Sequence, residues 1–178
     1  MRPLPVLAGL LALPTLALAT SLVPHTLLQR AEESDRVALV QVLSQRVEET
    51  PGAQIPLKTL TRVVIGQDLR GHGPSEVTIV QLGGKLGLQT MEIPGDAQFH
   101  VGETAIVFIR CRLAADRCHL VAMGQGKLDV AGDDVFVQDL FTGKWGKRTL
   151  ASLATELAPR APVAVPAPST STVPAVKR

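Results

Sequence analysis

The sequence predicts a small, mainly β protein, built as a closed or partly open barrel with a short N-terminal helix and a C-terminal helix. At least five short apolar segments, separated by Gly and Pro turn signals, have the spacing typical of a barrel or a sandwich. A short helix that leads into a long first strand favours the barrel. Aromatic residues are scarce, with no Tyr, one Trp and four Phe, so the core must be aliphatic.

The N-terminal half predicts one helix and three strands. Pro24 can occupy the first turn of a helix that carries Leu27 and Ala31 on one face. Apolar residues on both faces of the next segment predict a strand that enters a core. Proline and glycine pairs then separate this strand from the following ones. The predicted strands cover residues 36–47, 57–67 and 76–82.

Residues 83–102 form the longest predicted loop, an irregular stretch with a Pro-Gly turn. Loops of this length are usually functional or mobile. Its apolar residues Met91, Ile93 and Phe99 are therefore candidate contacts for a partner. The alternative is that they cover the open end of the barrel.

The C-terminal half predicts four further strands and a helix. Strands at 103–112 and 117–123 form a hairpin, and two shorter strands follow at 127–131 and 135–138. Thr149 can cap a last helix that Pro159 ends.

The two cysteines, Cys111 and Cys118, face each other across the first of these hairpins. An exported protein meets an oxidising compartment, in which such a pair tends to close. We therefore expect a disulfide. A redox-active pair is the alternative, but such pairs more often show C-x-x-C spacing at the start of a helix.

The N-terminus has the pattern of a secretory signal peptide. Arg2 precedes an uncharged run of about 15 residues, and small residues follow at Ala17 and Ala19. A membrane anchor is the alternative, but this run contains Pro14 and is shorter than the roughly 20 residues that a spanning helix needs. We expect a secreted or periplasmic protein.

The chain therefore divides into three predicted parts. They are a signal peptide at 1–19, a single β-barrel-like domain at 20–158, and a disordered tail rich in Pro, Ala, Ser and Thr at 159–178. No segment after the cleavage site has the length and hydrophobicity of a transmembrane helix.

Charge and composition argue against a nucleic-acid partner. The net charge is +2, and acidic and basic residues are interspersed, so no single-sign field gathers nucleic acid or an anionic membrane. The few aromatic residues offer little stacking surface for single strands.

Motifs for catalysis, metals or cofactors are not found. The four histidines show no i,i+4 pair of a helical zinc site. Four aspartates between Asp129 and Asp139 lack the glycine and closing glutamate of an EF-hand loop. Residues 124–127 lack the context of a phosphate loop, and Ser75 and Ser152 lack that of an activated nucleophile. Two of the carboxylates Glu92, Asp96 and Glu103 could act as an acid/base pair, but the sequence alone gives no distance between them.

Several turn and strand motifs carry a resemblance to known proteins. They are Leu27-Leu28, residues 33–40, Gly83-Gly84, Pro94-Gly95 with Phe99, Gly102-Glu103 before residues 106–109, and residues 123–127. Over residues 24–137 the chain resembles a group of uncharacterised exported bacterial proteins. These are expected to share the OB-like barrel of tissue inhibitors of metalloproteinases and netrin-like modules.

The resemblance implies an OB-like fold and no specific activity. The metalloproteinase inhibitors ligate the zinc of their target with a cysteine at the mature N-terminus. This chain has Thr20 or Ser21 at that place, so the resemblance does not extend to zinc-directed inhibition.

The leading hypothesis is an exported, non-enzymatic module that binds a protein partner, either an envelope component or an extracellular protease. Two alternatives stay open. One is a small extracytoplasmic enzyme with an unrecognised site, and the other is a structural envelope protein tethered by its tail. A deep polar pocket with converging carboxylates or histidines favours an enzyme, whereas a flat apolar patch on the long loop at 83–102 favours binding.

Overall fold

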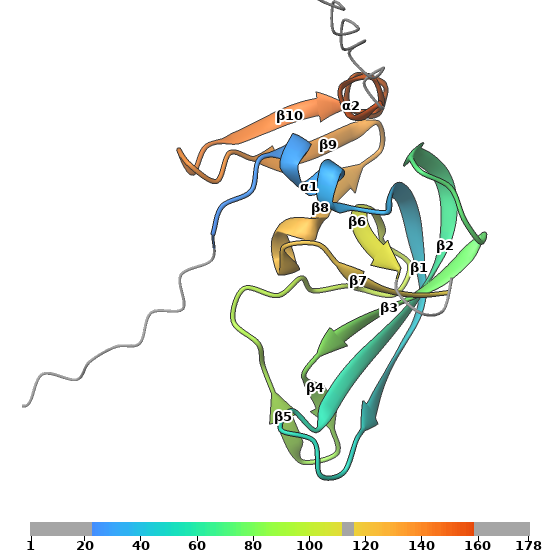
Figure 1. The fold of residues 1–178 in the computed structure, drawn as a ribbon, viewed down its shortest axis with the longest axis vertical. Coiled ribbons are helices and arrows are strands. Elements are labelled where there is room, and N and C mark those ends of the chain that lie inside the picture. The colour runs from blue at the N-terminus through green and yellow to red at the C-terminus, as the bar shows by residue number, and fades with distance from the viewer. Residues whose placement is uncertain (1–22, 112–115, 159–178) are drawn as a thin grey trace, which may run out of the picture.

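The computed structural model describes residues 23–111 and 116–158, which hold a mainly β fold with two helices (Figure 1). The expected signal peptide and tail lie outside the described residues. The elements in chain order are α1 (Leu27–Glu33), β1 (Arg36–Glu49), β2 (Leu57–Arg70), β3 (Glu76–Leu82), β4 (Gly84–Leu86), β5 (Gln89–Met91), β6 (Thr104–Cys111), β7 (Arg117–Leu120), η1 (Met123–Gly126), β8 (Lys127–Ala131), β9 (Asp134–Gln138), β10 (Trp145–Thr149) and α2 (Leu150–Leu157).

Five strands close into a barrel in the order β1-β2-β3-β7-β6, and β6 pairs again with β1. The β3–β7 pair is parallel, and the other pairs in this ring are antiparallel. A five-stranded Greek-key barrel of this kind is an OB-like fold, as predicted. The sandwich alternative is wrong, because the ring of strands closes on itself.

The strands with apolar residues on both faces are explained by two separate cores. One face of β1 and β6, with Val40 and Val107, points into the barrel and packs with residues from all five barrel strands. The other face, with Val37 and Phe108, packs under the helices and β9. Both faces of these strands are therefore buried.

The second core lies at one end of the barrel, where β8, β9 and β10 continue the sheet from β6 (Figure 1). Helices α1 and α2 cover this end, and Ala31, Leu153 and Leu157 contribute the fully buried side chains. The small hairpin β4–β5 lies at the opposite end. No helix within residues 23–111 and 116–158 is long and apolar enough to span a membrane.

Threonine side chains start both helices. The Oγ1 of Thr26 accepts from the backbone N–H of Gln29, and the Gln29 side chain accepts from the N–H of Thr26, which makes a capping box. The Oγ1 of Thr149 accepts from the N–H of Ser152, as the sequence predicts for the last helix. The Thr149 cap fixes the point at which β10 passes into α2.

Four parts of the chain differ from the prediction. Pro24 lies before the first helix and not in its first turn, because Thr26 is the N-cap. Residues 83–102 are not wholly irregular, because β4 and β5 form a hairpin within them. The strand predicted over 117–123 ends at Leu120, where Ala122 and Met123 take left-handed backbone angles and begin η1. Strand β10 was not predicted.

Candidate binding surfaces

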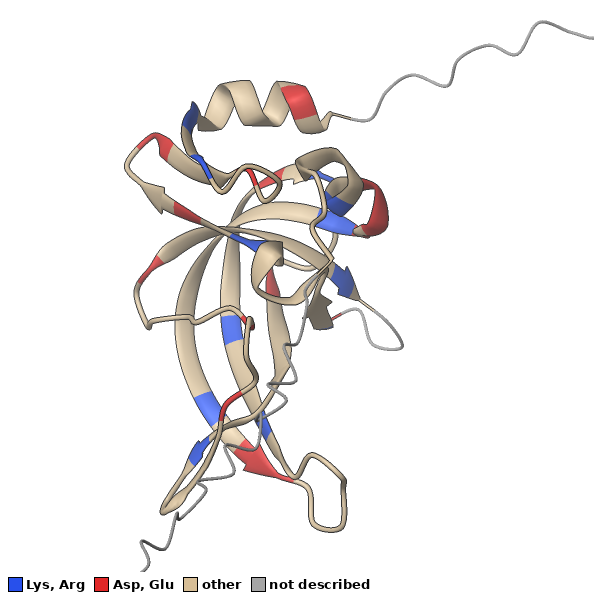
Figure 2. Ribbon diagram, turned by 90° about the vertical axis from the view of Figure 1, so that its left-hand side faces the viewer, with Lys and Arg blue, Asp and Glu red and all other residues tan. Residues whose placement is uncertain are grey.

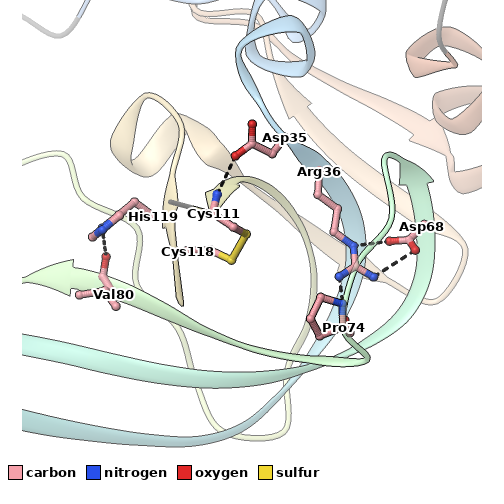
Figure 3. The surroundings of a disulfide bond; sticks show 8 residues. All are labelled: Asp35, Arg36, Asp68, Pro74, Val80, Cys111, Cys118 and His119. Carbon is pink, nitrogen blue, oxygen red and sulfur yellow. Dashed lines mark hydrogen bonds and ion pairs between the residues drawn. A yellow bond between two sulfur atoms is a disulfide. The ribbon is translucent and has the colours of Figure 1, made fainter. Parts of the chain in front are cut away.

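Cys111 and Cys118 form a disulfide, with their sulfur atoms 2.02 Å apart (Figure 3). The two residues face each other in the antiparallel register of β6 and β7, which confirms the predicted pairing. The backbone N–H of Cys111 donates to Asp35 Oδ2 at 2.8 Å. The disulfide therefore joins two barrel strands at the point where the chain also contacts the start of β1.

A nearby ion pair fixes the same rim of the barrel. Arg36, which is buried, donates from Nε and Nη2 to the two carboxylate oxygens of Asp68 at 2.5 and 3.0 Å, and from Nη1 to the Pro74 carbonyl at 2.7 Å (Figure 3). A bidentate pair with satisfied donors can hold a buried guanidinium in place. This cluster joins β1, β2 and the turn before β3, and it offers no free charge to a ligand.

The predicted contact residues Met91, Ile93 and Phe99 all line one open groove of about 880 Å³, here called the loop groove. It lies between the ends of β1, β2 and β3 and the segment 84–99. Gln81, which is buried, donates to the Ala97 carbonyl at 2.7 Å and holds this segment against β3.

The three residues differ in accessibility. Met91 and Ile93 are partly exposed, whereas Phe99 is only 5% exposed and packs in the barrel core. Lys127 Nζ lies 5.3 Å from the centre of the Phe99 ring and 3.1 Å from Glu103 Oε1. Phe99 is therefore core cover, and only Met91 and Ile93 remain available as contacts.

Exposed aromatic residues gather at the other end of the barrel. Phe99 and Phe108 are buried, whereas Phe136, Phe141 and Trp145 are 37, 67 and 64% exposed. All three exposed rings belong to the hairpin formed by β9, its turn and β10. In a chain with five aromatic residues, this concentration on one hairpin marks an exposed apolar surface.

The turn of this hairpin is held by Asp139. Its Oδ1 accepts from the backbone N–H groups of Phe141 and Thr142 at 2.9 and 3.0 Å, and its own N–H donates to the Lys144 carbonyl. The N–H groups of Thr142 and then Phe141 lower the pKa of the Asp139 carboxyl. The turn presents Phe141 on an ordered loop.

A groove of about 530 Å³ lies between this hairpin and α1, and we call it the hairpin groove. Its lining includes Leu27, Arg30, Val137, Phe141, Trp145 and Gly146, together with Glu156 of α2. A Cβ at position 146 would meet only the Val137 carbonyl oxygen, at 3.7 Å. The absent side chain at Gly146 therefore leaves the middle of β10 open.

Arg30 contributes a buried positive charge to this groove. It is 3% exposed, lies 5.3 Å from the centre of the Phe108 ring, and donates to the Thr26 and Gln125 carbonyls. No carboxylate of the described residues lies within 4.0 Å of it. Burial lowers the pKa of Arg30 to about 10, so the guanidinium is charged at neutral pH.

Two of the acidic residues that the sequence offers for catalysis or metal binding, Glu103 and Asp134, take part in separate ion pairs. Glu103 pairs with Lys127, and Asp134 pairs with Lys147 at 2.6 Å. Within residues 23–111 and 116–158, no group of three or more His, Cys, Asp or Glu side chains could hold a metal ion. Lysine, arginine and acidic residues are scattered over the barrel, the hairpin and the helices (Figure 2).

The hairpin groove was missed in the sequence because β10 has no apolar alternation. The one available signal was the position of the aromatic residues, since Phe136, Phe141 and Trp145 lie within ten residues of each other. No protein-family model, curated protein or solved structure matches the chain.

Proposed function

We propose that this protein is an exported, non-enzymatic module that binds a protein partner through the hairpin groove and the exposed rings of Phe136, Phe141 and Trp145. The observation that carries the proposal is the exposure of three of five aromatic side chains on one hairpin. Tryptophan and phenylalanine bury large apolar areas on contact, and tryptophan is enriched among the residues that dominate binding energy.

The disulfide supports export, because such bonds form and persist in oxidising compartments. Export itself, a periplasmic or secreted location, and a partner in the envelope or outside the cell are part of the proposal. The OB-like barrel is compatible with the resemblance to netrin-like modules, and this resemblance stays a prediction.

The test is a capture experiment. The mature protein and its Trp145→Ala and Phe141→Ala variants are immobilised on beads, and proteins are captured from the envelope and secreted fractions. A partner retained by the wild type should lose about thirtyfold in affinity with Trp145→Ala, the effect of a 2 kcal/mol anchor. Both variants should keep the free energy of unfolding within about 0.5 kcal/mol, because these side chains are exposed.

Leu88→Ala is the matched control, since Leu88 is fully exposed at the tip of the β4–β5 hairpin. It should bind like the wild type. Equal capture by the wild type and both aromatic variants would show that the partner uses another surface, and loss with Leu88→Ala alone would move the contact to the tip of the β4–β5 hairpin.

A further inference from the structure

We propose that the hairpin groove is a docking site for the chain's own segment Ala161–Pro168, bound as an extended polyproline II strand. The inference goes beyond the proposed function, because it holds whether or not another protein binds there. It rests on where the chain leaves α2, on the chemistry of the segment, and on the open floor of the groove.

The chain leaves α2 at the edge of this groove. Glu156, two residues before the helix C-cap, lines it and pairs with Arg148 of β10 at 3.3 Å. The C-cap residue Ala158 has φ −53° and ψ 141°, which lies in the polyproline II region. Pro159 then restricts its own φ to a compatible value. The backbone thus leaves the helix in the conformation that the docked segment would need.

The segment matches the groove in chemistry. Residues 161–168 are only Ala, Pro and Val, with three prolines and no charge. Proline-rich segments in this conformation dock in grooves lined by aromatic residues. The groove offers Trp145 and Phe141, both more than half exposed, and contact with uncharged side chains would cover them.

Gly146 provides the space for such a strand. A side chain at this position would project into the groove, and its nearest atom, the Val137 carbonyl oxygen, lies at ordinary contact distance. Position 146 has no positive φ, so the backbone does not require glycine there. The missing side chain is better explained by the need for room on β10.

The tether makes this segment the favoured occupant over a free peptide. Only Ala158, Pro159 and Arg160 separate it from the end of α2, and short tethers give effective concentrations in the millimolar range. In polyproline II the eight residues span about 25 Å. Even a weak contact is then populated, and an external partner must displace the segment.

The test uses the fluorescence of Trp145, the single tryptophan of the chain, in the full mature protein with no partner present. We expect the variant P162S/P166S/P168S to raise the acrylamide quenching constant about twofold and to shift emission to longer wavelength, because the docked segment covers about half of the exposed ring. P174S is the matched control, since it removes a proline outside the segment, and it should behave like the wild type.

Gly146→Val supplies the second arm. The valine side chain fills the middle of the groove. In this background the triple proline substitution should change neither the quenching nor the emission of Trp145. The unfolding transition of Gly146→Val should match that of the wild type, which shows that the domain is intact. Equal quenching of Trp145 in the wild type and the triple variant overturns the inference. Protection that disappears on dilution also overturns it, since the occupant would then be the tail of a second copy.

The outcomes separate this inference from the proposed function. If Trp145 is equally accessible in all tail variants while Trp145→Ala still abolishes capture of the partner, only the tail inference fails. If the tail variants expose Trp145 and the aromatic variants capture the partner normally, the groove serves the tail and the proposed function fails.

Discussion

Phe99 shows how one loop residue supports the whole barrel. Its ring is buried among barrel residues, and Lys127 lies beside it with Glu103 and Asp129 as charge partners. The segment that carries Phe99 is thus attached both by apolar packing and by a half-buried ion cluster. Its neighbours Met91 and Ile93 are held less firmly, because they lie at the surface of the loop groove.

Phe99→Ala should therefore lower the free energy of unfolding by about 3 to 5 kcal/mol, the range for truncating a buried phenylalanine. Met91→Ala, the companion variant, should cost about 1 kcal/mol, since its side chain is already partly exposed. Chemical denaturation of both variants measures this difference. Equal stabilities of Phe99→Ala and the wild type would place the ring at the surface.

Gly84 is required by a close approach of β4 to β1 and β2. Its φ is +136°, and an added Cβ would lie 2.6 Å from Thr59 Oγ1 and 2.8 Å from Val47 Cγ2. Gly84→Ala should therefore destabilise the protein by about 2 to 4 kcal/mol through strain and overlap. Gly87→Ala is the control, because its Cβ would meet no atom within 4 Å and only its φ of +59° is unfavourable, at about 1 kcal/mol.

Thermal unfolding of the two glycine variants checks this prediction. The prediction is wrong if both variants lose the same stability, because the close contacts of Gly84 would then contribute nothing.

At the scale of elements, most strands could be predicted because their residues follow the two-residue period of a buried or half-buried strand. β3 and β8 have the predicted bounds, and β1 and β6 carry apolar residues on both faces because two cores flank them. β10 could not be found this way. Every residue in it is exposed, so only its pairing with β9 defines it.

The candidate site was predicted only in part for the same reason. The loop groove could be anticipated from the length of the loop, but the burial of Phe99 depends on how that loop folds over the barrel. The hairpin groove requires α1 to meet β10 and α2, and α1 lies more than 100 residues before these two consecutive elements in the chain.

The turn between β9 and β10 should loosen in acid. Because the pKa of Asp139 is lowered in the folded protein, the charged carboxylate stabilises the turn above the ordinary pKa of 3.8, and this contribution is lost as the pH falls through the folded value. Trp145 emission should therefore change below pH 3.8 in the wild type. Asp139→Asn keeps an acceptor oxygen and cannot titrate, so its emission should be independent of pH in this range.

An acid transition of the same size in Asp139→Asn would assign the change to other carboxylates. Far-UV circular dichroism, recorded over the same pH range, separates loosening of the hairpin from unfolding of the barrel.

At the scale of the whole molecule, closure of the barrel depends on its shortest strand. β7 has four residues and joins β3 through two paired positions, Thr78 with Arg117 and Ile79 with Cys118. On its other side, the disulfide ties β7 to β6. The parallel seam and the disulfide thus meet at Cys118, which is fully buried in the barrel core.

Removing the disulfide should therefore weaken closure before it affects the rest of the sheet. The variant C111S/C118S should lose about 2.5 kcal/mol of unfolding free energy, the chain-entropy value for so short a loop. Hydrogen exchange should rise first in β7 and at the β3 positions that pair with it, because few contacts hold this seam. The long β1–β2 pair, with register over most of its fourteen residues, should stay protected. Uniform loss of protection across β1, β2 and β7 would instead show that the barrel opens as one cooperative unit, with the disulfide supporting every strand equally.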